Sequence, residues 1–198
     1  MAMTSVSLSL SNGRVQAAAP ERHFDFAKPL DGWETIAGKW AIEDVAAARD
    51  GRALVQRATK NEFNVIVAPG GPYGDVDVSV RFAPISGRED ASGGIVFRFA
   101  EGRYYVIRAN ALEGNFRFYY YDHGRHQIDT ASVTAPALGQ WHKLRVRAEG
   151  DRIQGWLNDQ ALIDRRDGRY KSGRIGLWTK ADSVTAFDDL TVVALSDG

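Results

Sequence analysis

The chain has 198 residues, of which 44% are hydrophobic and 25% are charged, as is ordinary for a globular protein, and this length suits a single all-β domain. Lys and Arg number 25, as do Asp and Glu, so the formal net charge is zero and no overall basic field recruits nucleic acid or an anionic membrane. Cysteine is absent, which excludes a disulfide framework and thiolate chemistry, and no apolar run approaches the roughly 20 residues of a membrane span.

The amino-terminal segment differs in character from the rest of the chain. Its sequence, MAMTSVSLSLSNGRVQAAAP, is small and polar and ends in a run that resembles a small-residue cleavage site. No positively charged region opens it, and serines interrupt its apolar stretch, so it departs from the usual export signal. We interpret residues 1–22 as a disordered leader or a remnant export signal, and residues 23–198 as one domain.

From His23 onward, hydrophobic and polar residues alternate with the period of two that is typical of β-strands. In residues 75–82 (DVDVSVRF), three valines and a phenylalanine share one face, and Asp77, Ser79 and Arg81 share the other. The same alternation predicts further strands at residues 103–109, 115–121, 143–148 and 153–157.

Turn-forming pairs separate these runs at short intervals, among them Asp50-Gly51, Glu101-Gly102, Glu113-Gly114 and Asn158-Asp159. Gly, Asn and Asp tolerate the positive φ that tight hairpins need. The one stretch that could be helical, residues 43–48, is short and runs into Asp50-Gly51, so we expect strand or loop there. This pattern predicts an all-β fold, an antiparallel two-sheet sandwich. Its predicted core includes Val76, Val78, Val80, Leu144 and Val146.

Four pairs of segments resemble a known family. They are Leu30–Trp33 with Gly38–Trp40, Ser92–Arg98 with Tyr104-Tyr105, Gln140–Leu144 with Trp156–Asn158, and Gly173–Trp178 with Phe187–Val192. Over residues 24–194 the chain is similar to the 3-keto-disaccharide hydrolase domain family, part of the concanavalin-A-like lectin and glucanase superfamily. The resemblance implies a concanavalin-A-like jelly roll for the domain.

The strand pattern also predicts a polar, aromatic face opposite the core. Aromatic rings stack on sugar rings, and the planar guanidinium of arginine holds hydroxyls or carboxylates through paired hydrogen bonds. Within residues 116–121 the odd positions share one face, and Tyr120 lies on the other. The alternative is a solvated sheet with ordinary cross-strand pairs. The candidate binding residues on one concave sheet are Asp77, Ser79, Arg81, Arg98, Arg117, Tyr119, Tyr121, Trp178 and Lys180.

Two functions are compatible with this face. The first is a periplasmic or secreted carbohydrate-binding module, which needs no catalytic residues. The alternative, implied by the family, is a glycoside-cleaving enzyme in which a 3-keto group permits elimination chemistry. The glucanase pattern Glu-x-Asp-x-x-Glu is absent, and Asp77 with Glu62 is the only obvious acid pair, which we interpret as sheet-surface charge. A sandwich that serves only in assembly is a third possibility, and the sequence leaves the oligomeric state open.

The resemblance further implies a structural metal site. Superfamily sandwiches often bind calcium through an aspartate of the last strand together with backbone carbonyls. Asp188 is the matching position, with the Asp50-Gly51 turn as a source of carbonyl oxygens. Calcium takes six to eight oxygen ligands, so one carboxylate with carbonyls and waters is adequate. The alternative is that Asp188 or Asp189 accepts backbone hydrogen bonds at a strand end.

Overall fold

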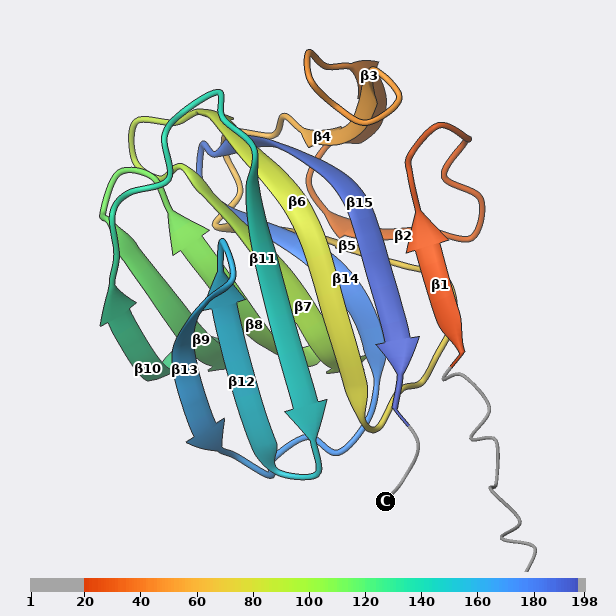
Figure 1. Ribbon diagram of the computed structural model, residues 1–198, viewed down its shortest axis with the longest axis vertical. Helices are drawn as coiled ribbons and strands as arrows, with labels where there is room; N and C mark the ends of the chain where they lie inside the picture. The colour runs from red at the N-terminus through yellow and green to blue at the C-terminus, as the bar shows by residue number, and fades with distance from the viewer. Residues whose placement is uncertain (1–19, 196–198) are drawn as a thin grey trace, which may run out of the picture.

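The computed structural model describes residues 20–195, whose strands form two antiparallel sheets packed face to face (Figure 1). Sheet A contains, in spatial order, β13 (Gln160–Arg166), β12 (Arg152–Leu157), β11 (His142–Glu149), β6 (Val76–Ser86), β15 (Val184–Ala194), β4 (Arg52–Gln56) and β3 (Trp40–Asp44), with β1 (Glu21–Phe24) paired to β15. Sheet B contains β10 (Arg125–Ser132), β9 (Asn115–Tyr121), β8 (Arg103–Asn110), β7 (Ser92–Ala100), β14 (Arg174–Lys180), β5 (Phe63–Val67) and β2 (Glu34–Ala37). The expected antiparallel two-sheet sandwich is therefore confirmed.

The residues that the period of two predicted to be in the core are buried there. Val76, Val78 and Val80 of β6 are buried between the sheets, and so are Leu144 and Val146 of β11. The two strands are neighbours in register, with Val78 opposite Val146 and Val80 opposite Leu144. Burial of these apolar faces against sheet B is the main favourable contribution to the fold.

Within each sheet, pairings near the centre join segments that are far apart in the chain. Strand β15 lies between β6 and β4 in sheet A, while β14 lies between β7 and β5 in sheet B. Thus the last two strands complete the centres of both sheets, one on each side of the core. Residues 43–48 contain the end of β3 followed by a loop, as expected.

The first strand begins two residues before the predicted domain start. Glu21 and Arg22 pair with Val193 and Val192 of β15, so this part of the interpreted leader belongs to sheet A. The rest of that interpretation, on residues 1–19, lies outside the described residues. Within residues 20–195, no helix is long and apolar enough to cross a membrane.

Candidate functional site

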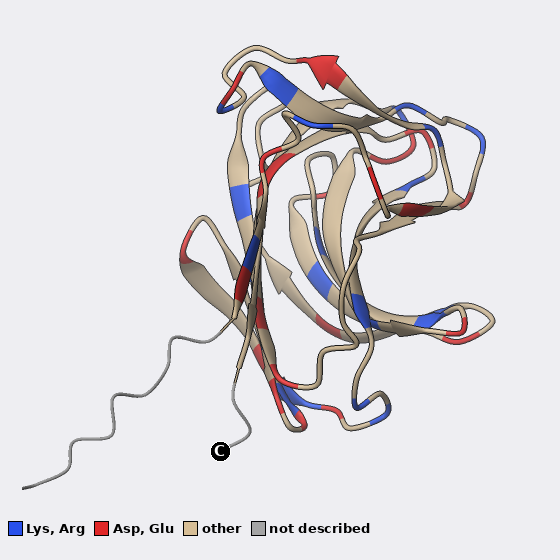
Figure 2. Ribbon diagram, turned by 90° about the vertical axis from the view of Figure 1, so that its right-hand side faces the viewer, with Lys and Arg blue, Asp and Glu red and all other residues tan. Residues whose placement is uncertain are grey.

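Sheet B is strongly bent, and its outer face is concave (Figure 2). Phe63 of β5 contacts Tyr121 of β9, with 5.8 Å between the ring centroids, although three strands separate β5 from β9. In a flat sheet these strands would lie roughly 19 Å apart, since neighbouring strands are about 4.8 Å apart. The bend therefore brings side chains from opposite sides of the sheet together over its centre.

A second apolar cluster fills the middle of this concave face. Its buried members are Val65, Val67, Val96, Phe99, Tyr104, Val106, Tyr119 and Trp178, and Phe63 and Tyr121 pack against them. All of these side chains lie on the side of sheet B away from the main core. The centre of the concave face is therefore packed, and contact with a ligand is left to the surrounding side chains.

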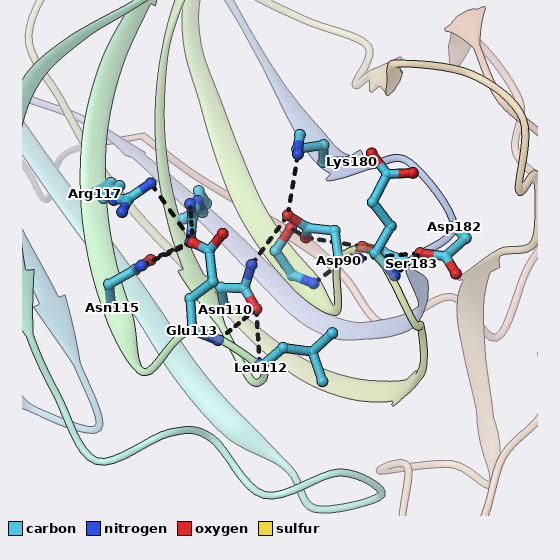
Figure 3. A network of polar contacts seen from close by, with 12 residues as sticks. Asp90, Asn110, Leu112, Glu113, Asn115, Arg117, Lys180, Asp182 and Ser183 are labelled. Carbon is cyan, nitrogen blue, oxygen red and sulfur yellow. Dashed lines mark hydrogen bonds and ion pairs between the residues drawn. The ribbon is translucent and has the colours of Figure 1, made fainter.

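A polar cluster lies at one end of the concave face, around the hairpin that joins β8 to β9 (Figure 3). Arg108 donates hydrogen bonds to the Asn115 side chain, to Glu113 Oε2 at 3.2 Å and to the Tyr119 hydroxyl at 3.3 Å. Arg117 donates to the same hydroxyl at 3.3 Å, and its Nη1 lies 3.5 Å from Glu113 Oε2. Tyr119 and Glu113 thus hold both guanidinium groups.

Cross-strand pairing accounts for this arrangement. Arg108 of β8 and Arg117 of β9 are directly opposite each other, a position at which like charges are unfavourable. Glu113 lies between them, and its hydrogen bond from Asn115, reinforced by Arg108, lowers the pKa of its carboxyl group below the usual value. Gly94 leaves room for Arg108, because a Cβ there would lie 3.0 Å from the Arg108 Cβ.

A buried carboxylate borders the polar cluster. Asp90 accepts hydrogen bonds from the hydroxyls of Ser92 and Ser183 and from Asn110 Nδ2, and Lys180 Nζ lies 3.8 Å away. Asp182 holds the loop that carries Asp90, because its carboxylate accepts hydrogen bonds from the backbone N–H groups of the three consecutive residues 88–90 (Figure 3). Every oxygen of Asp90 therefore has a partner, and the group is held rigidly.

Three arginine nitrogens on the concave face are buried and without a hydrogen-bond partner within the described residues. They are Arg108 Nε, Arg117 Nε and Arg125 Nη1. Arg125, from β10, lies over the Tyr119 ring, with its Cζ 4.4 Å from the ring centroid, and over Phe63 at 5.5 Å. Buried donors without acceptors are rare in folded proteins, because each loses its hydration without compensation. All three belong to arginines whose guanidinium groups adjoin Tyr119.

Known proteins that are similar to this chain have the same fold. Residues 20–193 match the family described as 3-keto-alpha-glucoside-1,2-lyase-like domain. The chain belongs to this family. The match includes every strand of both sheets as far as Val193 near the end of β15, and it confirms the resemblance inferred from the four pairs of segments.

Two solved structures and one curated protein are also similar. The levanase of Bacillus subtilis (strain 168) is 24% identical over 173 residues, which cover 84% of this chain and 23% of the levanase. The chain thus spans about a quarter of the length of this relative. The carbohydrate-binding module CBM66 of Bacillus subtilis has a TM-score of 0.70 at 22% identity, with coverage of 82% of this chain and 95% of the module. The β-glucanase of Bacillus licheniformis has a TM-score of 0.61 at 13% identity, covering 91% and 100%. These likenesses confirm the jelly-roll sandwich.

In this member of the lyase-like family, five of the predicted binding residues share the concave face of sheet B. They are Arg117, Tyr119, Tyr121, Trp178 and Lys180. However, Trp178 is 0% exposed and Tyr119 is 3% exposed, so neither ring has a free face on which a sugar could stack. Tyr121 is half-buried and stacks on Tyr104 with 5.0 Å between the centroids.

The remaining predictions on this face do not agree with the structure. Asp77, Ser79 and Arg81 belong to β6 of sheet A and point outward on the opposite side of the molecule. There Asp77 pairs with Arg145 at 2.5 Å, as expected of surface charge, whereas Glu62 precedes β5 of sheet B. The expectation of one shared sheet was wrong for these residues, because period-two alternation does not identify the sheet to which a strand belongs.

Arg98 is also absent from the concave face. A bulge in β7, where Arg98 has φ of 52°, interrupts the alternation and turns the side chain inward. Its guanidinium donates to the backbone carbonyls of Gly74, Tyr170 and Gly150 at 2.8–3.3 Å. Arg98 therefore ties together three loops at the end of the sandwich.

Asp188 is buried at a second bulge, in β15, where it accepts hydrogen bonds rather than facing a free cavity. The backbone N–H groups of Arg49 and Asp189 donate to it at 2.7 and 2.8 Å, and Arg81 Nη1 lies 3.4 Å away. Burial raises the pKa of its carboxyl group. Arg81 also donates to the carbonyl of Ala47, in the loop before the Asp50-Gly51 turn. These residues do not fit calcium well, because a guanidinium group occupies the position beside the carboxylate. The calcium site stays a prediction.

Sequence reasoning missed four residues of the site: Asp90, Arg108, Glu113 and Arg125. One signal was available for Arg108, since it alternates with Tyr104 and Val106 on the same face of β8. Glu113 lies in the turn that follows, which we interpreted only as hairpin punctuation. Arg125 approaches Phe63 only because sheet B is bent, and no pattern in the sequence indicated that contact.

Proposed function

We propose that the protein is a carbohydrate-binding module and that its site is the polar end of the concave face, formed by Arg108, Glu113, Arg117, Arg125 and Lys180. The observation that carries the proposal is the cluster of three guanidinium groups around Tyr119, two of which, those of Arg117 and Arg125, are partly exposed. Arginine donors beside a carboxylate acceptor suit the hydroxyls of a sugar, which donate and accept at once. The carbohydrate-binding module with the same fold supports this class of ligand.

The test is a titration of purified protein against a panel of soluble glycans by calorimetry. Arg117→Ala should weaken binding of any glycan that binds by about tenfold or more, because a hydrogen bond to a charged group contributes about 1.5–3 kcal/mol. Arg147→Ala on the outer face of sheet A is the matched control, since the two arginine side chains are 30% and 34% exposed. Equal loss of affinity in both variants would contradict the proposed site.

The Tyr119 hydroxyl yields a sharper prediction. Tyr119→Phe keeps the ring in the apolar cluster but removes the acceptor shared by Arg108 and Arg117. We expect the fold to keep its stability to within about 1 kcal/mol and glycan affinity to fall several-fold, since both guanidinium groups lose orientation. Tyr120→Phe is the control, because Tyr120 lies on the opposite face of β9, packed against the main core. A Tyr119→Phe variant with unchanged affinity would show that the hydroxyl does not organise the site.

Cleavage of a 3-keto-glycoside is the second candidate, favoured by the family match. Such an elimination needs a base to remove the proton beside the ketone while the glycosidic oxygen leaves with its bonding electrons and is protonated. The two carboxylates nearest to the arginine cluster are poor bases for this step, since Asp90 is fully hydrogen-bonded and Glu113 has a lowered pKa. The arrangement of these carboxylates therefore favours carbohydrate binding over cleavage. Incubation with a 3-keto-glucoside, followed by chromatography of the products, tests turnover directly.

A further inference from the structure

Positive charge exceeds negative charge around Tyr119. Three guanidinium groups adjoin its side chain, from Arg108, Arg117 and Arg125. Glu113 is the only acidic side chain within ion-pair distance of any of the three among residues 20–195, and it pairs with Arg108 and Arg117. Arg125 has no ion pair within that range and is held by the rings of Tyr119 and Phe63. The group as a whole carries two positive charges in excess.

The nearby charged side chains do not remove this excess. Lys180 lies 3.8 Å from Asp90, so these two groups balance each other. Lys60 and Glu62 line the adjoining groove and have opposite charges. Glu89 lies farther along the same rim, in a hollow with Lys60, Glu62 and Lys180. The uncompensated charge is therefore located at Arg117 and Arg125.

The exposed donors of Arg117 and Arg125 indicate the kind of group that would complete the site. Arg117 and Arg125 are both partly exposed, and a guanidinium only donates hydrogen bonds, so their exposed N–H groups can be paired only by an acceptor from outside the protein. A sugar hydroxyl would supply an oxygen but leave the charge in place. A carboxylate or a sulfate supplies two or more acceptor oxygens and a negative charge, and arginine binds such groups in a planar, paired geometry.

We infer that the glycan bound at the concave face is anionic, with its carboxylate or sulfate between Arg117 and Arg125 beside Tyr119. This inference rests on the proposed function. A groove of about 630 Å³ next to Phe63, lined also by Ile36, Tyr104 and Tyr121, offers an apolar surface to a neighbouring sugar ring of the same chain. Phe63 lines this groove and also lies beneath the Arg125 guanidinium, so the groove adjoins the proposed anion site.

The test compares polymers that differ only in charge. Polygalacturonate is paired with its fully methyl-esterified form, and dextran sulfate is paired with dextran, so that carboxylate and sulfate are distinguished. Affinities are measured by calorimetry at two salt concentrations, for the wild type, Arg125→Gln and Arg152→Gln. Arg152, on sheet A, is the matched control because each variant loses one positive charge.

The expected result is binding of at least one charged polymer at least about tenfold more tightly than its neutral counterpart. Arg125→Gln should abolish most of that preference, whereas Arg152→Gln should leave it unchanged, and salt should weaken binding only partly because the site is half-buried. Equal affinity for charged and neutral forms, or equal effects of the two variants, would overturn the inference while the proposed function stands. Binding of no glycan in these pairs or in the wider panel would instead contradict the proposed function.

Discussion

Replacing Trp178 with alanine is expected to lower the free energy of unfolding by about 3–5 kcal/mol, the cost of emptying a large buried aromatic site. Trp178 is 0% exposed, lies between Gly94 and Val65 of the neighbouring strands, and stacks on Phe63 with 5.6 Å between centroids. The ring is therefore a packing element of the concave face and is not free to stack on a ligand.

Urea denaturation followed by circular dichroism measures this loss. Trp141→Ala is the control, since Trp141 is half-buried and contacts Arg81 at the surface of sheet A, so its removal should cost less. If Trp178→Ala kept the stability of the wild type and lost only glycan binding, the ring would be a ligand contact and the second apolar cluster would not contribute to the fold.

Replacing Arg98 with methionine is expected to lower the free energy of unfolding by about 3 kcal/mol, because three backbone carbonyls lose their charged donor. Arg98 is 1% exposed, and its Nη2 also lies 3.7 Å from Asp75. Desolvation lowers the pKa of the buried guanidinium, so the hydrogen bonds that it donates offset a real cost of burial. Methionine retains most of the apolar volume, which isolates the polar contribution.

The exposed Arg103 provides the comparison for Arg98. Arg103→Met removes a surface pair with Glu101 in the neighbouring hairpin and should change stability by less than about 1 kcal/mol. Glycan affinity measured on folded Arg98→Met protein should equal that of the wild type, because Arg98 is turned away from the concave face. A loss of glycan affinity with normal stability would show instead that Arg98 contributes to the binding site.

The stability predictions and the binding predictions divide the concave face between two roles. Its centre, with Trp178 and Val65, is packed like a core, and its polar end carries the partly exposed Arg117 and its partner Glu113. Rigid packing beneath a polar cluster keeps the donors in place, which reduces the entropy lost when a ligand binds.

The sequence by itself determined where the regularly alternating strands lie and which side of each of them faces the core. Residues 75–82 illustrate this, since strict alternation leaves one way to bury Val76, Val78 and Val80. It also determined that Arg117, Tyr119 and Tyr121 share a face, with Tyr120 on the other side against the core. These outcomes depend on neighbours two residues apart, and a local period is sufficient to predict them.

Only the tertiary structure decided which faces come together. Asp77 and Arg117 have the same alternating pattern around them, yet they lie on different sheets, because strand pairing joins residues far apart in the chain. A bulge at Arg98 reversed the direction of that side chain, and a bulge depends on the pairing of the neighbouring strands. The bend of sheet B brought Arg125 to Phe63 and buried Trp178 and Tyr119. The candidate ligand contacts are therefore the arginines around these rings and not the rings themselves. Curvature arises from the packing of the whole sheet, and no short segment of the sequence encodes it.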